Sequence, residues 1–73
     1  MPKLPRVSSA EAQRALERLG FVKLRQRGSH VVKRRDAKSC VVPMHSELKV
    51  GTLADLLRQA DVRPEDFIEA LRK

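Results

Sequence analysis

Aromatic side chains are scarce in this sequence, which holds two phenylalanines and neither tyrosine nor tryptophan in 73 residues. Modules that read single-stranded nucleic acid bind bases by stacking them on aromatic side chains. Phe21 and Phe67 both stand where core residues are expected, so neither is free for stacking. The composition therefore disfavours a base-stacking RNA reader.

Cysteine and glycine are also sparse. The single cysteine, Cys40, has no internal partner for a disulfide, which favours a reducing compartment. One cysteine and two histidines, His30 and His45, are too few for a structural zinc site, and the three glycines form no phosphate-binding loop. Cys40 lies in a valine-rich segment, where we expect a small core residue. We expect neither a metal ion nor a cofactor.

Long apolar runs are missing as well. No stretch approaches the ~18 apolar residues of a transmembrane helix, and residues 1–6 lack the apolar centre of a signal peptide. We therefore expect a cytoplasmic protein without membrane contact. A chain of 73 residues buries too little surface for a second core or a large cofactor cavity. We expect one domain over residues 1–73.

Positive charge, in contrast, is abundant and concentrated. The formal net charge is +7, and residues 21–38 carry seven basic residues against one acidic residue. Such a concentration is typical of a protein that binds a polyanion. The alternative is a solvated basic surface that serves solubility, but such a surface would spread its charge along the chain.

The first regular element is a helix over residues 9–19. Ser8 and Glu11 have the spacing of a capping box, and Gly20 suits the left-handed position that ends a helix. Apolar residues recur at helical spacing at Ala12, Ala15, Leu16 and Leu19.

Residues 21–27 and 30–34 alternate as strands and predict a β-hairpin. A turn at residues 36–38 leads to a third strand over residues 39–42, which Pro43 ends. These segments predict a three-stranded antiparallel sheet.

For the hairpin we prefer a three-residue loop over residues 27–29 to a two-residue turn. It pairs Leu24 with Val32 and Val22 with Arg34, which gathers the apolar side chains on one face. The same register places His30 opposite Gln26, and it groups Lys23, Arg25, Val31, Lys33 and Arg35 on the other face.

Two helices follow a loop over residues 44–50. Thr52 with Asp55 predicts a cap for the first of them, and Pro64 suits the first position of a short last helix. Their apolar stripes are Leu53, Leu56, Leu57 and Ala60, and then Phe67, Ile68 and Leu71. The order of elements predicts an α+β fold with helices on one face of the sheet.

His30 is the strongest candidate for chemistry, because it follows a glycine-containing turn within the basic segment. A neutral imidazole beside bound phosphate can act as a general base toward a ribose 2′-hydroxyl, while cations stabilise the phosphoryl charge. The alternative is a structural or phosphate-contacting histidine. The candidate RNA-binding residues are Lys23, Arg25, Arg27, Gly28, Ser29, Lys33 and Arg35, with His45 as an auxiliary candidate.

The chain resembles the HicA toxins of bacterial toxin–antitoxin systems from residue 4 to residue 71. The motifs that carry the resemblance are Leu4-Pro5-Arg6-Val7-Ser8, Leu19-Gly20-Phe21, Gly28-Ser29-His30, Val42-Pro43-Met44-His45, Glu47-Leu48-Lys49, Gly51-Thr52-Leu53 and Pro64-Glu65-Asp66-Phe67. Departures are Val31-Val32-Lys33 where many members have a further histidine or an aromatic, Asp36-Ala37-Lys38 in place of Pro-Asp-Gly, and Arg63 in place of a capping hydroxyl residue.

The resemblance implies a double-stranded-RNA-binding-domain-like α-β-β-β-α fold with a short terminal helix. It also implies ribosome-independent mRNA cleavage by the histidine of Gly-Ser-His, here His30, and neutralisation by a HicB-type antitoxin. Growth arrest and stress response are the biological roles attached to the family. The alternatives are a non-catalytic RNA-binding module and, more weakly, a DNA-binding component that acts only within the antitoxin complex.

Overall fold

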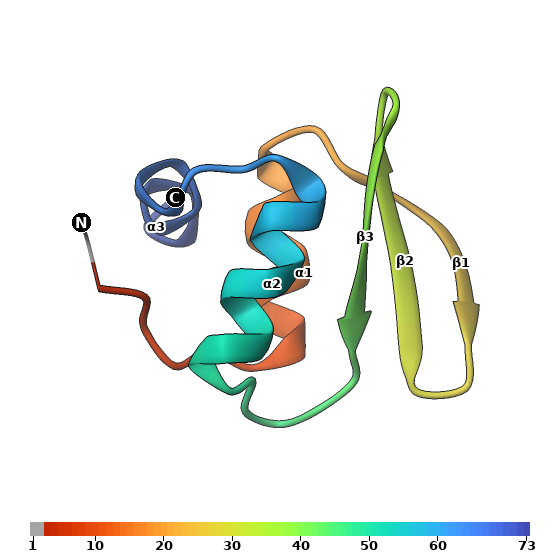
Figure 1. The fold of residues 1–73 in the computed structure, drawn as a ribbon, viewed down its shortest axis with the longest axis horizontal. Helices are drawn as coiled ribbons and strands as arrows, with labels where there is room; N and C mark the ends of the chain where they lie inside the picture. Colours follow the sequence, from red (N-terminus) through yellow and green to blue (C-terminus); the bar gives the residue numbers. More distant parts are fainter. Residues whose placement is uncertain (1–2) are drawn as a thin grey trace.

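The computed structural model describes residues 3–73 and places three helices on one side of a small antiparallel sheet (Figure 1). The order of elements is α1 (Ser9–Arg18), β1 (Val22–Arg27), β2 (His30–Arg35), β3 (Lys38–Pro43), α2 (Val50–Ala60) and α3 (Pro64–Leu71). The strands lie in the order β1-β2-β3. The predicted α+β class and the α-β-β-β-α order with a short last helix are confirmed.

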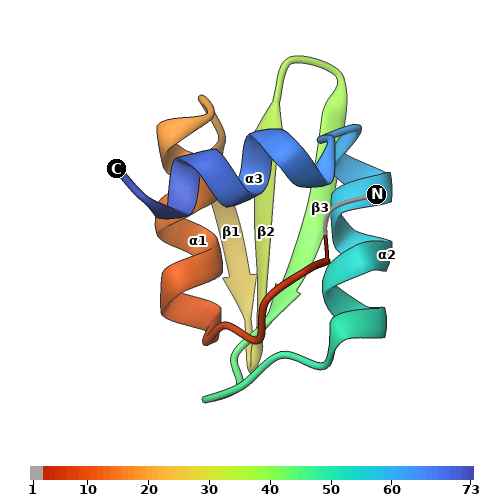
Figure 2. The ribbon, with the colours of Figure 1, turned by 90° about the vertical axis from the view of Figure 1, so that its left-hand side faces the viewer.

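All three helices lie on one side of the sheet. Helices α1 and α2 form the layer next to it, and α3 crosses them on the side away from the strands (Figures 1 and 2). Helix α2 packs on β3, and α1 contacts both β3 and α3. Within residues 3–73, no helix covers the opposite face of the sheet (Figure 1).

Helix α1 begins and ends by the predicted signals. The Glu11 amide donates to Ser8 Oγ at 3.1 Å, and the Ser8 amide donates to Glu11 Oε1 at 2.9 Å. This capping box satisfies backbone groups that a helix end leaves unpaired. After the C-cap at Leu19, Gly20 has a φ of 100°, a value that glycine adopts without strain.

The predicted Thr52–Asp55 cap of α2 is wrong. The helix begins at Val50, and its N-cap is Lys49, which makes no side-chain capping bond. The Leu53 amide already donates to the Lys49 carbonyl at 2.9 Å, so the first turn closes before Thr52 can act as a cap. Helix α3 begins at its proline, as predicted.

The core lies between the sheet and the helices. Phe21 and Phe67 are both buried in it, which confirms their predicted packing role. Cys40 is also buried, and this burial raises the pKa of its thiol to about 11, although the positive charge of Lys33 acts in the opposite direction. Cys40 is thus the small core residue that the sequence predicts. No helix within residues 3–73 is long and apolar enough to cross a membrane.

The hairpin turn differs from the prediction. Gly28 and Ser29 form a two-residue turn, so that His30 pairs with Arg27 and not with Gln26. Gly28 has a φ of 58°, which a two-residue hairpin turn favours and which glycine adopts readily. The tight turn is therefore available without the three-residue loop.

A β-bulge in β1 shifts the register by one residue between the turn, where Arg27 pairs with His30, and the far end of the hairpin, where Val22 pairs with Arg34. Leu24 is the extra residue of the bulge, and Val32 pairs with Arg25 in its place. The predicted Leu24–Val32 pair is therefore wrong, whereas the predicted pairing of Val22 with Arg34 is confirmed.

Side-chain alternation assigns the two faces. Val31 and Lys33 are buried under the helices, and Lys23 pairs with Lys33 on the same face. Arg35 follows the same alternation, so four of the five residues predicted to share a face do so. Arg25 is the exception, because the bulge turns it to the opposite face, opposite Val32.

Candidate functional site

The predicted catalytic histidine lies at the end of the sheet that carries the Gly28-Ser29 turn. His30 is the first residue of β2 and is exposed. It stands between Arg27 of β1 and Pro43 of β3 in the register of the sheet. A Cβ built on Gly28 would meet no atom within 4 Å, so the backbone of the turn is open to a ligand. A phosphate group can therefore approach both the turn and the imidazole.

The loop between β3 and α2 packs against this turn, as Figure 1 shows at the lower end of the sheet. The Met44 amide donates to the Ser29 carbonyl at 2.6 Å. The next residue, His45, accepts a hydrogen bond at its carbonyl from the Ser9 amide at 2.9 Å. The two histidines, 15 residues apart in the chain, thus stand on neighbouring segments at one end of the sheet.

Helix α1 holds this loop through the side chain of Met44. The Met44 sulfur accepts hydrogen bonds from Ser9 Oγ at 3.4 Å and from Gln13 Nε2 at 3.2 Å. Gln13 Nε2 also donates to Ser9 Oγ at 3.0 Å. Sequence reasoning missed these three residues, because nothing in helical or strand periodicity pairs a loop methionine with the start of a helix.

Arg25 and Arg27 lie on the same face of the sheet as His30, and all three side chains are exposed. Lys23 pairs with Lys33 on the other face but is exposed too. Its Nζ donates to Gln26 Oε1 at 3.0 Å, and Gln26 Nε2 donates to the Gly28 carbonyl at 3.2 Å. Lys23 therefore supports the turn from the helix side.

Lys33, predicted to bind RNA, is inside the protein. Its side chain is 1% exposed, and its Nζ donates to Glu17 Oε2 at 2.6 Å. The ammonium group is neutralised beneath α1 and is not offered to a ligand. Lys33 is two residues from Val31 on β2, so both side chains point to the buried face of the sheet. The expectation that Lys33 contacts phosphate is therefore wrong.

Arg35 also serves the fold. Its Nη1 donates to the Leu19 carbonyl at 2.7 Å, and its guanidinium lies 4.8 Å from the centre of the Phe21 ring. Its Cδ lies 3.3 Å from the point where a Cβ on Gly20 would stand. These contacts tie the end of β2 to the end of α1, so Arg35 is not free to bind phosphate as predicted.

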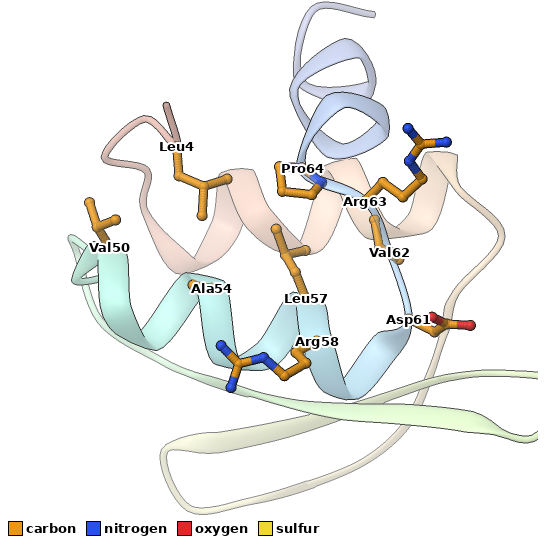
Figure 3. A pocket seen from close by; sticks show the side chains of 9 residues that line it. All are labelled: Leu4, Val50, Ala54, Leu57, Arg58, Asp61, Val62, Arg63 and Pro64. Atoms are coloured by element: carbon orange, nitrogen blue, oxygen red, sulfur yellow. The ribbon is translucent and has the colours of Figure 1, made fainter. Parts of the chain in front are cut away.

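An apolar hollow of the described chain lies elsewhere. It encloses about 580 Å³ between Leu4, α2 and the link from α2 to α3 (Figure 3). Its lining is mainly apolar and contains none of the predicted site residues. Within residues 3–73, no three side chains of His, Cys, Asp or Glu gather as a metal-binding group.

Comparison with known families agrees with this arrangement. Residues 9–62 match the family described as the HicA toxin of bacterial toxin–antitoxin systems. The matched segment includes α1, the sheet, the Gly28-Ser29-His30 turn, His45 and α2. A search among curated proteins found no significant match. A family match over most of the chain, on a fold of the implied α-β-β-β-α order, shows that this protein belongs to the HicA toxin family and is the toxin of a toxin–antitoxin system.

Proposed function

We propose that this toxin is a ribosome-independent endoribonuclease that cleaves mRNA in the cytoplasm with His30 as general base and without a metal ion. The observation that carries the proposal is the position of His30. It is exposed beside Arg25 and Arg27 on a sheet face whose strands present no acidic side chain. A family of toxins in which RNA cleavage is general supports the same conclusion.

The chemistry follows from the groups at this end of the sheet. His30 takes the proton of a ribose 2′-hydroxyl, and the 2′-oxygen attacks the adjacent phosphorus. The bond from phosphorus to the 5′-oxygen breaks, which leaves a 2′,3′-cyclic phosphate on one product. Arg25 and Arg27 stabilise the negative charge on the phosphoryl oxygens. The leaving 5′-oxygen takes a proton from an acid, for which His45, a lysine and water are the candidates.

RNA contacts in this proposal come from Lys23, Arg25, Arg27 and the Gly28-Ser29 turn. Lys33 and Arg35 have no part in them, because both are held by intramolecular partners. The toxin is neutralised by a HicB-type antitoxin that covers His30, and any contact with DNA is made through that antitoxin. The second candidate function, a non-catalytic RNA-binding module, would use the same exposed arginines.

The decisive experiment compares wild type with His30→Ala on a defined single-stranded RNA. We expect the rate of cleavage to fall by about 10²- to 10⁴-fold, the range that a general base contributes. The circular dichroism spectrum should not change, because His30 is exposed and outside the core. His45→Ala is the matched control and should reduce the rate less.

Three outcomes would contradict this proposal. Cleavage at the wild-type rate by folded His30→Ala would remove His30 from the mechanism. Loss of wild-type cleavage in excess chelator, with recovery on adding a divalent ion, would show that the reaction needs a metal. Binding of RNA without cleavage would favour the non-catalytic module.

A further inference from the structure

The face of the sheet that no helix covers is defined by the strand register. Residues that alternate away from the buried Val31, Lys33, Cys40 and Val42 form it, and we call this surface the open face. Its members are Val22, Arg25, Arg27, His30, Val32, Arg34, Ser39, Val41 and Pro43. None of them is acidic.

The open face has a second part besides the His30 end. Val22 is 63% exposed and Val41 is 40% exposed, and half-buried Val32 lies between them on the middle strand. Val32 pairs directly with Val41 and lies diagonal to Val22, which brings neighbouring aliphatic side chains within contact range. Leu24, at the bulge, adds a further aliphatic side chain that is 50% exposed. We call these four residues the apolar strip.

An exposed apolar strip of this kind marks a candidate interaction surface. RNA is a poor occupant, because the strip offers no aromatic ring for stacking and no polar group for phosphate. A second copy of the chain is disfavoured, because each copy carries a net charge of +7 and every charged residue on its open face is basic. Arg25 pairs with Val32 across the strands, and Arg34 lies two residues further along β2 on the same face. Arg34 Nε donates to the Asp36 carbonyl at 2.7 Å, but the residue is exposed, so both positive charges favour an acidic partner.

We propose that the apolar strip is the docking surface of the antitoxin, and that it is separate from the RNA-cleaving end of the same face. The antitoxin segment that fits it presents aliphatic side chains between carboxylates, which pair with Arg25 and Arg34. The inference rests on the proposed function only in that an antitoxin is the partner. It assigns a large share of the affinity for the antitoxin to aliphatic side chains that take no part in cleavage, whereas Arg25 serves both the antitoxin and the phosphate.

The test uses the full-length double variant Val22→Thr/Val41→Thr, because threonine keeps the β-branched shape that strands favour. Calorimetry with a purified HicB-type antitoxin should show affinity reduced by about tenfold or more, as expected when apolar anchors of an interface are removed. Replacing Val41 by glutamate should weaken binding further, since it adds repulsion toward an acidic partner. Cleavage of a defined RNA by the double-threonine variant should stay at the wild-type rate.

Val50→Thr is the matched control, because Val50 is an equally exposed valine on α2, on the helix side of the sheet. Its antitoxin affinity should equal that of wild type. Wild-type antitoxin affinity in the double-threonine variant would overturn the proposal. An equal loss of RNA affinity would assign the strip to RNA, and a wild-type dimer that the variant dissociates would assign it to a second copy. If wild-type toxin cleaves no RNA but the variant still loses antitoxin, the proposed function fails while the docking surface stands.

Discussion

The two faces of the sheet use neighbouring residues of the same strands for opposite purposes. Val31 and Lys33 of β2 are buried under the helices, whereas His30 and Arg34, one position away, are exposed. On the covered face the Lys33 ammonium is inside the protein and is neutralised by Glu17. On the open face, cations stand beside His30 without an acidic neighbour. A run of basic residues therefore does not carry one role, and strand alternation decides which members can meet a ligand.

The largest expected effect on stability comes from a polar substitution on the covered face. Val31→Ser should lower the free energy of unfolding by about 2–4 kcal/mol, because it removes a fully buried side chain and buries a hydroxyl. Val32→Ser on the open face should cost less than about 1 kcal/mol. Urea unfolding of both variants measures the difference, and equal losses would mean that the two faces are not distinct.

The buried thiol predicts a loss of stability at high pH. The raised pKa of Cys40 means that the native protein keeps its proton while the unfolded chain releases it, so stability falls as the pH rises from 9 to 11. The loss should be about 2 kcal/mol over this window. Cys40→Ala removes this contribution, and the check is a shallower pH dependence of its unfolding free energy. Parallel curves for the two proteins would contradict the prediction.

A smaller effect should follow from the ion pair beneath α1. Glu17→Ala leaves the Lys33 ammonium buried without its partner, which should cost about 1–2 kcal/mol because the Glu17 side is half exposed. Lys33→Met keeps the packed stem without the charge and should be nearly neutral in stability. Thermal unfolding compares the pair. Greater destabilisation by Lys33→Met than by Glu17→Ala would show that the ammonium itself stabilises the fold.

The smallest effect concerns RNA affinity. Arg27→Gln should reduce the slope of log affinity against log salt by roughly 0.7, the contribution of one phosphate contact on a single strand. Lys33→Met should leave that slope unchanged, because its charge is already paired inside the protein. Fluorescence titrations at several salt concentrations provide the measurement. A reduced slope for Lys33→Met would return this lysine to the RNA-binding surface.

Local signals predicted most of the elements. The Ser8–Glu11 capping box and Gly20 set the ends of α1, and Pro64 marked the start of α3, because each acts within one turn of the chain. The position of His30 beside the hairpin turn was predictable for the same reason. The first turn of α2 was not, since its backbone closes without a side-chain cap.

The faces of the sheet were harder to predict, because β2 carries a valine on each of them. Val31 is buried and Val32 is not, and the choice is made by β3, where Cys40 and Val42 point into the core. Periodicity within one strand cannot break such a tie. The bulge at Leu24 was equally hard to predict. It depends on the two-residue turn and the Val22–Arg34 pair forming together, and neither of them alone requires an extra residue.

This bulge also determines what a deletion of one codon would change in the sheet. Leu24 is one extra residue in β1, so Lys23 and Arg25 lie on opposite faces of the sheet although they are two residues apart. Loss of that one codon would place Lys23 directly before Arg25 and restore a regular strand, in which Val22, Lys23 and Arg25 keep their present faces. A deletion at this one site would thus remove Leu24 from the apolar strip while the arginines beside His30 stay on the open face, without altering any helix of the fold.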